Sequence, residues 1–279
     1  MLTMTSQTSF SLGAGELELG TSTVPKDHGE STLTGPGPIA YSPSGRLAIL
    51  DAHKGRAIWA DDGRPVADFS TTFLLTDPIS VAGFLVNDRG AAYSAGTTIV
   101  LGFGSQVAVD LTGWTPGNYS LAPLESSEGI ILTTALDGRR LPLVTEDGLA
   151  APNTPSSLHS NQVALNELID DSIYIASPFL GRIDSDVELF PVPDVSRQTP
   201  NAVLIVLVDE KNDLWVVRAD EDGTTVSRIP LATLLPAEHP RAWGNTPAYA
   251  VHPDLTELSV LICETDTCEL QTYDLTRGS

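Results

Sequence analysis

A strand–turn–strand pattern runs through Ile39-Ala40-Tyr41-Ser42-Pro43-Ser44-Gly45-Arg46-Leu47-Ala48-Ile49-Leu50-Asp51. Two apolar runs flank a Pro-Ser-Gly turn, and both have the length of strands in a small sheet. Two more strands are expected directly afterwards, at Arg56–Ala60 and Val66–Phe69, separated by Asp62-Gly63. Asp-Gly between two such runs is a strong hairpin signal. Residues 36 to 69 therefore predict one antiparallel sheet of four strands.

The same pattern returns along the whole chain, with a turn residue before a short apolar strand. The turns fall at Gly45, Gly90, Gly129, Asp171, Asp213 and Glu257, which lie 39 to 45 residues apart. The strands after them are Leu47–Leu50, Ala91–Tyr93, Ile130–Leu132, Ile173–Ile175, Leu214–Val217 and Leu258–Ile262. A period of about 40–45 residues with several short strands in each repeat is typical of propeller blades.

The expected fold class is all-β, a six-bladed β-propeller that forms a single domain over residues 1–279. The blades are expected to start near residues 36, 78, 119, 162, 202 and 248, and residues 1–34 form a closing segment. The last blade has room for only three strands before the chain stops. An alternating patch at Phe10–Leu19 is expected to supply its fourth strand, which would remove an open sheet edge and join the two ends.

The charge excludes several classes of partner. The 279 residues carry 36 acidic and 15 basic side chains, a net charge of −21. Such a charge repels phosphate backbones and anionic lipids, so neither nucleic acid nor membrane is an expected partner. No apolar run reaches the length of a membrane span. The composition leaves the oligomeric state open.

Cys263 and Cys268 are the only cysteines, and they bracket the polar residues Glu264-Thr265-Asp266-Thr267. In a hairpin with that loop the two would lie opposite each other, close enough for a disulfide. Free thiols or a weak metal site are the alternatives. A disulfide predicts an extracytoplasmic location, periplasmic or secreted. The start of the chain lacks the features of a signal peptide, so a leader would have been removed, and a cytoplasmic location is the alternative.

One repeat resembles a known family. Residues 35–59 are similar to an NHL-type propeller repeat, in which Gly-Pro precedes the inner strand, Asp closes the second strand and Asn-x-Arg-Ile opens the third. Gly35-Pro36, Asp51 and Arg56 match this pattern, whereas Lys54 stands where Asn is usual and Ala57 precedes Ile58. The resemblance implies a six-bladed fold and a binding role. It implies no catalytic residues, because NHL repeats are structural.

An enzymatic alternative comes from a second resemblance. Calcium-dependent lactonases of the gluconolactonase type share the six-bladed plan and hold their metal in the central channel with acidic and amide side chains of the inner strands. The residues at comparable positions here are Asn87, Asn166, Glu167, Asp209 and Asp254. They stand in different turn contexts, and the Glu-Gly-Pro run of that family is missing. Calcium is the one cofactor that this alternative requires; the binding interpretation requires none.

Catalytic motifs are otherwise missing from the sequence. It contains no Gly-x-Ser-x-Gly elbow, no His-Glu-x-x-His and no phosphate-binding loop, and its five histidines are dispersed. Asp51, His53, Lys54 and Arg56 crowd one loop. They could bind a ligand, or Asp51 and Arg56 could pair and tie neighbouring strands together.

Aromatic side chains mark the expected binding surface. Trp114, Tyr119, Trp243 and Tyr249 fall in or beside the connections between repeats. Such connections gather at one mouth of a propeller, where exposed aromatics bind sugars or anchor a protein. Packing between blades is the alternative role for them. The sequence thus favours a non-catalytic binding or scaffolding module for a protein or glycan.

Overall fold

The computed structural model shows an all-β fold. It describes residues 2–25, 31–69, 81–95, 98–110, 121–126, 129–134, 140–145, 148–149, 165–169, 172–175, 182–184, 189–192, 195, 197–199, 201–211, 213–230, 248–264 and 266–276. In these ranges the one regular helical element is the short 3₁₀ helix η1 (Ala52–Lys54). No helix among them is long and apolar enough to cross a membrane.

Antiparallel sheets of three to five strands follow one another along the chain. The first sheet contains β4 (Ile39–Tyr41), β5 (Leu47–Asp51), β6 (Arg56–Trp59) and β7 (Pro65–Asp68). The second contains β8 (Val81–Asn87), β9 (Gly90–Ala95), β10 (Thr98–Phe103) and β11 (Ser105–Asp110), and the third contains β12 (Leu121–Ser126), β13 (Gly129–Thr134), β14 (Arg140–Thr145) and β15 (Gly148–Leu149).

The remaining sheets complete the chain. The fourth contains β16 (Leu165–Ile169), β17 (Ser172–Ile175) and β18 (Arg182–Asp184). The fifth contains β19 (Leu189–Pro191), β20 (Arg197–Gln198), β21 (Ala202–Asp209), β22 (Leu214–Asp220) and β23 (Gly223–Ile229). The last sheet contains β24 (Ala248–Val251), β25 (Glu257–Cys263), β26 (Thr267–Asp274) and β1 (Thr3–Ser11), and β2 (Ser22–Pro25) pairs with β3 (Ser31–Thr34) in a separate hairpin.

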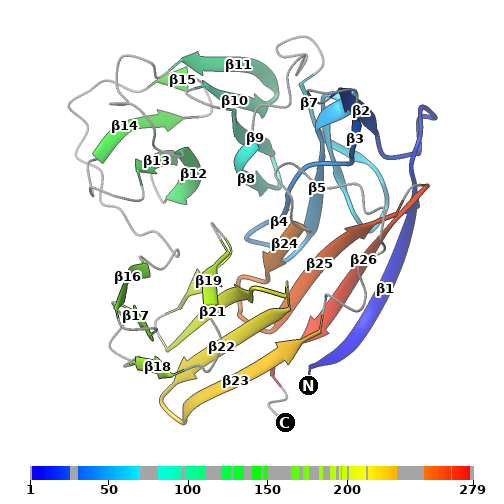
Figure 1. Ribbon diagram of the computed structural model, residues 1–279. Helices are drawn as coiled ribbons and strands as arrows, with labels where there is room; N and C mark the ends of the chain where they lie inside the picture. Colours follow the sequence, from blue (N-terminus) through cyan, green and yellow to red (C-terminus); the bar gives the residue numbers. More distant parts are fainter. Residues whose placement is uncertain are drawn as a thin grey trace.

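The sheets lie around a common centre, in chain order (Figure 1). The first strand of a sheet contacts the first strand of the next: β24 contacts β4, β4 contacts β8 and β8 contacts β12. Each of the six apolar strands predicted after a turn is confirmed as a strand, β5, β9, β13, β17, β22 or β25, that pairs with a neighbour on both sides. The turn spacing therefore located one strand in each of the six sheets.

The fifth sheet begins earlier than the sequence suggested. A start near residue 202 was expected, with Leu189–Pro191 in the preceding repeat, but β19 and β20 both pair with β21. Between them Val192 and Val195 are buried in the same apolar cluster as Leu204 of β21. Pro191 ends β19, because proline cannot donate a ladder hydrogen bond. This sheet therefore has two short strand pieces where the others have one strand.

The N-terminal strand completes the last sheet, as predicted, but with different bounds. β1 pairs antiparallel with β26, from Thr3 opposite Asp274 to Ser11 opposite Thr267, with a register shift between Met4 and Ser6. The strand was expected at Phe10–Leu19, and most of that patch instead turns back on itself. Gly13 N–H donates to the carbonyl of Leu19 at 2.9 Å. Both ends of the chain thus belong to one sheet (Figure 1).

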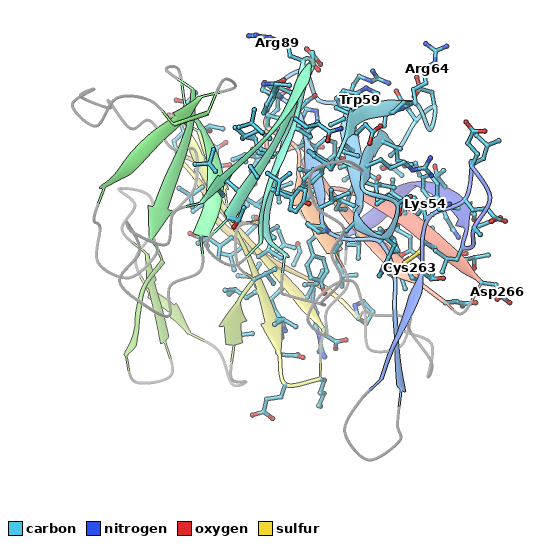
Figure 2. The ribbon with its side chains drawn as sticks, turned by 90° about the horizontal axis from the view of Figure 1, so that it is seen from above. Lys54, Trp59, Arg64, Arg89, Cys263 and Asp266 are labelled. Carbon is cyan, nitrogen blue, oxygen red and sulfur yellow. A yellow bond between two sulfur atoms is a disulfide. The ribbon has the colours of Figure 1, made fainter. Side chains whose placement is uncertain are left out.

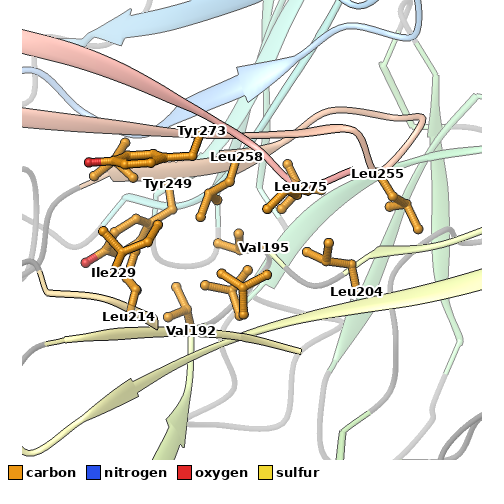
Figure 3. Packing of buried hydrophobic residues seen from close by; sticks show 14 of the residues in the cluster. Val192, Val195, Leu204, Leu214, Ile229, Tyr249, Leu255, Leu258, Tyr273 and Leu275 are labelled. Atoms are coloured by element: carbon orange, nitrogen blue, oxygen red, sulfur yellow. The ribbon is translucent and has the colours of Figure 1, made fainter. Parts of the chain in front are cut away.

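Apolar side chains are buried between neighbouring sheets. One cluster joins the fifth and last sheets and includes Leu204, Leu214, Tyr249 and Tyr273 (Figure 3). Another joins the first and second sheets, where the rings of Phe69 and Tyr93 meet edge to face at 5.0 Å. The third joins the last and first sheets and takes in Leu19, with Ile39, Ile49, Ile58, Ala60, Ala248, Ala250, Leu261, Cys263, Cys268 and Leu270.

We expect Leu19→Ala to lower the free energy of unfolding by about 2–5 kcal/mol, because Leu19 is fully buried and its removal leaves a cavity between the last and first sheets. Urea denaturation measures the effect. Leu17→Ala is the matched control, because Leu17 is 90% exposed two residues earlier. Equal stability of the two variants would show that the N-terminal segment does not stabilise the boundary between the last and first sheets, which we call the seam.

Candidate functional site

The crowded loop of the first sheet binds the chain's own N-terminal segment. The Asp51 carboxylate is fully buried; one oxygen accepts from Gly20 N–H at 2.9 Å, and the other accepts from Arg56 Nε at 3.0 Å. Arg56 also donates to the carbonyl oxygens of Glu16 and Glu18, each at 2.8 Å. The paired role considered for Asp51 and Arg56 is confirmed. We call Asp51, Lys54 and Arg56 the N-terminal clamp.

Lys54 extends the N-terminal clamp along the same segment. Its Nζ donates to the carbonyl oxygens of Gly15 and Glu18, each at 2.5 Å (Figure 2). The turn comes so close that a Cβ on Gly20 would lie 2.7 Å from the Cβ of His53. Burial lowers the pKa of His53, against the charge of Asp51. Lys54 and Arg56 of this loop therefore donate hydrogen bonds to backbone carbonyl oxygens of the closing segment.

A second polar cluster lies at the turn between β21 and β22. One oxygen of the buried Asp209 carboxylate accepts from the backbone N–H groups of Lys211 and Asp213, at 2.9 and 3.0 Å. The other accepts from Trp215 Nε1 at 3.0 Å. Arg228 pairs with Asp213 and lies over the Trp215 ring, 5.3 Å from its centroid. The cluster ties the turn to the outer strand β23.

Burial alone raises the pKa of the Asp209 carboxyl, but the hydrogen bonds that it accepts and the charge of Arg228 hold that pKa below its usual value. Asp209 is therefore ionised at neutral pH, with both oxygens engaged by its own sheet.

A partly buried hydroxyl network links the first and last sheets. Tyr41 Oη lies 2.7 Å from Ser259 Oγ, which lies 3.0 Å from Thr272 Oγ1. Burial is the main cause that raises the pKa of Tyr41 to about 12. The Tyr41 ring also meets His252 edge to face at 5.0 Å. At neutral pH Tyr41 is a hydrogen-bonding group of the seam, and its proton stays on the phenol.

The turns between first and second strands also touch one another. Ser44 Oγ, in the first sheet, donates to Asp88 Oδ1, in the second, at 2.7 Å. On its other side, Gly45 (φ 83°) is so close to His252 of the last sheet that a Cβ would lie 2.5 Å from Nε2. These turns form a polar rim over three consecutive sheets.

The five candidate calcium ligands are not seen to form a cluster. Asn87 Oδ1 accepts from the backbone N–H groups of Arg89 and Gly90, and Asp209 is engaged as described. The side chain of Asp254 is 78% exposed beside His252. Asn166 and Glu167 lie in β16, and their side chains are outside the described part. Within that part, no group of three His, Cys, Asp or Glu side chains is close enough to hold a metal ion.

Three of the four predicted binding aromatics, Trp114, Tyr119 and Trp243, lie outside the described residues. The expectation that Tyr249 is an exposed binding residue is corrected by the structure. Tyr249 lies in β24, is 7% exposed and packs in the cluster between the fifth and last sheets (Figure 3). The Tyr249 side chain points toward the fifth sheet. This is the alternative role considered for these aromatics, packing between neighbouring sheets. Its exposure does not fit an anchor for a partner.

Cys263 and Cys268 lie opposite each other in the register of β25 and β26 and are joined by a disulfide. The pair is buried at the hairpin tip, and Leu12 N–H donates to the carbonyl of Asp266 in the same hairpin (Figure 2). The disulfide thus braces the hairpin against which β1 lies.

The sequence did not indicate which segment the clamp holds. Lys54 and Arg56 are two of only 15 basic residues, so their nearness to Asp51 was a visible signal. Their partners, however, are carbonyl oxygens of Gly15, Glu16 and Glu18, which leave no trace in a pattern of side chains.

No model of a protein family matches the sequence, and no curated protein matches it. Among solved structures, a streptogramin B lyase is 13% identical, with a TM-score of 0.43, over 91% of this chain and 97% of that one. A catalytically inactive variant of virginiamycin B lyase from Staphylococcus aureus with quinupristin is 13% identical, with a TM-score of 0.42, over 90% and 98%. Likeness at these values fixes neither the fold family nor the activity of this chain.

We expect Asp51→Ala to lower the free energy of unfolding by about 3–5 kcal/mol, because it leaves Arg56 and Gly20 N–H without their buried acceptor. Asp61→Ala is the control. Asp61 pairs with Arg46 at 2.7 Å but is 60% exposed, and exposed ion pairs contribute little. Urea denaturation that found the two variants equally stable would contradict a structural role for the N-terminal clamp.

The low pKa of Asp209 predicts a pH dependence of stability. Ionised Asp209 stabilises the fold at pH values above its unfolded pKa of about 4, and this contribution is lost as the pH falls through the lower folded pKa. We expect Asp209→Asn to be less stable than the wild type at neutral pH, with the difference shrinking as the pH falls below the unfolded pKa of about 4.

Urea denaturation at several pH values checks this expectation. Asp222→Asn, at an exposed turn, is the control and should change stability little at any pH. A difference between Asp209→Asn and the wild type that stays constant with pH would contradict the assignment.

Proposed function

We propose that this chain is a six-bladed β-propeller that works as a non-catalytic binding module for a protein or glycan. Six sheets in chain order around a centre support the propeller, as do the contacts that join the first strands β24, β4, β8 and β12 of four of these sheets. The N-terminal strand closes the ring by completing the last blade.

The observation that carries the binding role is that the polar groups described above are engaged within their own chain. The carboxylates of Asp51 and Asp209 each accept hydrogen bonds on both oxygens from their own chain. Tyr41 is held in a partly buried hydroxyl network. Groups engaged in this way contribute to stability, which favours a structural role for them over a catalytic one.

The binding face lies on the connections between consecutive blades. Turns inside the sheets are short, whereas residues 111–120 separate β11 from β12 and residues 230–247 separate β23 from β24. These two connections contain Trp114, Tyr119 and Trp243. Long connections with aromatic side chains are the usual place for recognition on a rigid scaffold. The disulfide supports an oxidising, extracytoplasmic location.

We expect Trp114→Ala or Trp243→Ala to weaken capture of partners from a native extract roughly thirtyfold, since truncating an anchor aromatic typically costs about 2 kcal/mol. Binding to the immobilised protein is measured for each variant. Val226→Ala is the control, because Val226 is 51% exposed on β23 and is not part of either connection in the sequence.

Equal capture by folded tryptophan variants would refute the proposed face. Hydrolysis of lactones or esters that depends on added calcium would refute the non-catalytic role and support the channel site with Asn87, Asn166, Glu167, Asp209 and Asp254.

A further inference from the structure

Strand β1 forms an exposed outer border of the last sheet (Figure 1). It has nine residues, and all of them except Phe10 are exposed. Because successive side chains of a strand point to opposite faces, exposure of consecutive residues means that neither face of β1 is covered. Among the described residues, β26 is its only strand partner.

Two hydrogen bonds identify the backbone groups on the free side. Leu12 N–H donates to Asp266 O at 2.8 Å, toward β26, whereas Ser11 O accepts from Leu19 N–H at 2.9 Å, on the opposite side. The register is regular from Ser6 to Ser11. Since the bonding direction alternates along a strand, the N–H and C=O groups of Gln7 and Ser9 also point outward. At Ser11 the outer edge is occupied by Leu19 of the same chain. At Gln7 and Ser9, no described strand pairs with the outer edge.

This edge lacks most of the protection that natural edge strands carry. Lysine, proline, short length and bulges normally prevent another strand from pairing. β1 contains no charged residue and no proline, and none of the described strands is longer. The one irregularity is the register shift between Met4 and Ser6. The edge therefore presents a ladder of free donors and acceptors to an extended chain.

The charge around the edge selects the chemistry of that chain. Residues 248–276, which include β24, β25 and β26, contain six acidic side chains and no lysine or arginine. Glu269 lies opposite Ser9 and Asp274 opposite Thr3 in the register. A second copy would bring the same acidic sheet alongside, whereas a basic segment would be attracted.

We propose that the outer edge of β1 binds an extended, lysine- or arginine-rich segment of another protein, which adds as a further strand of the last sheet. The backbone ladder supplies the main contacts, and the acidic sheet favours basic side chains on the added strand. This surface lies on the rim of the molecule and does not depend on the binding face proposed above.

The probe is a short synthetic peptide in which lysine alternates with valine and threonine, compared with the same peptide carrying glutamate in place of lysine. Calorimetry should show binding of the lysine peptide only. Hydrogen exchange should show that this peptide protects the amides of Gln7 and Ser9 and leaves those of Thr8 and Phe10 unchanged.

Gln7→Pro removes an outward N–H that β26 does not use, so the fold should persist while the affinity falls about tenfold or more. Gln7→Ala is the matched control, because it keeps the N–H and should bind within about twofold of the wild type. Ser9→Pro repeats the test at the next outward position. Trp114→Ala should bind the peptide normally, which separates this edge from the loop face.

Equal binding of the two peptides, or unchanged binding and unchanged amide protection with Gln7→Pro, would overturn the proposal. A wild-type dimer in sedimentation that Gln7→Pro dissociates would also overturn it, because the occupant would then be a second copy of this chain.

Discussion

The structure depends on fixing the N-terminal segment against the first and last sheets at once. β1 buries almost no side-chain surface, so backbone pairing with β26 is its main contribution. Backbone hydrogen bonds exposed to water contribute little net stability. The fully buried Leu19 and the N-terminal clamp supply what β1 lacks. A weak strand is thus held in place by a strongly anchored turn.

The same seam explains why several conspicuous polar residues have structural roles. Asp51, Arg56 and Lys54 hold carbonyl and N–H groups of residues 15–20, and Tyr41 joins the first sheet to Ser259 of the last. Buried carboxylates and phenols cost free energy unless their hydrogen bonds are satisfied. The first and last sheets are far apart along the chain, and these polar groups help to join them.

The repeat period and turn chemistry predicted one strand with partners on both sides in each of the six larger sheets, and a four-residue loop predicted that Cys263 and Cys268 lie opposite each other. The start of the fifth sheet was missed because prolines divide its first strand into the short pieces β19 and β20. Tyr249 was misplaced because its neighbours in sequence suggest a loop, whereas contacts with the fifth sheet bury it. The side chains of the N-terminal clamp were visible in the sequence, but their partners are backbone atoms of residues 15–20, which a pattern of side chains does not reveal.

Strand order has a consequence for how the chain is made. β1 is synthesised first, but its partner β26 appears about 260 residues later. At about 5–20 residues per second, β1 therefore waits roughly 15–50 seconds on the ribosome without a partner. A strand rich in threonine, serine and glutamine tolerates that delay in water better than an apolar one. Its polarity suits a segment that must stay soluble until β26 has been synthesised.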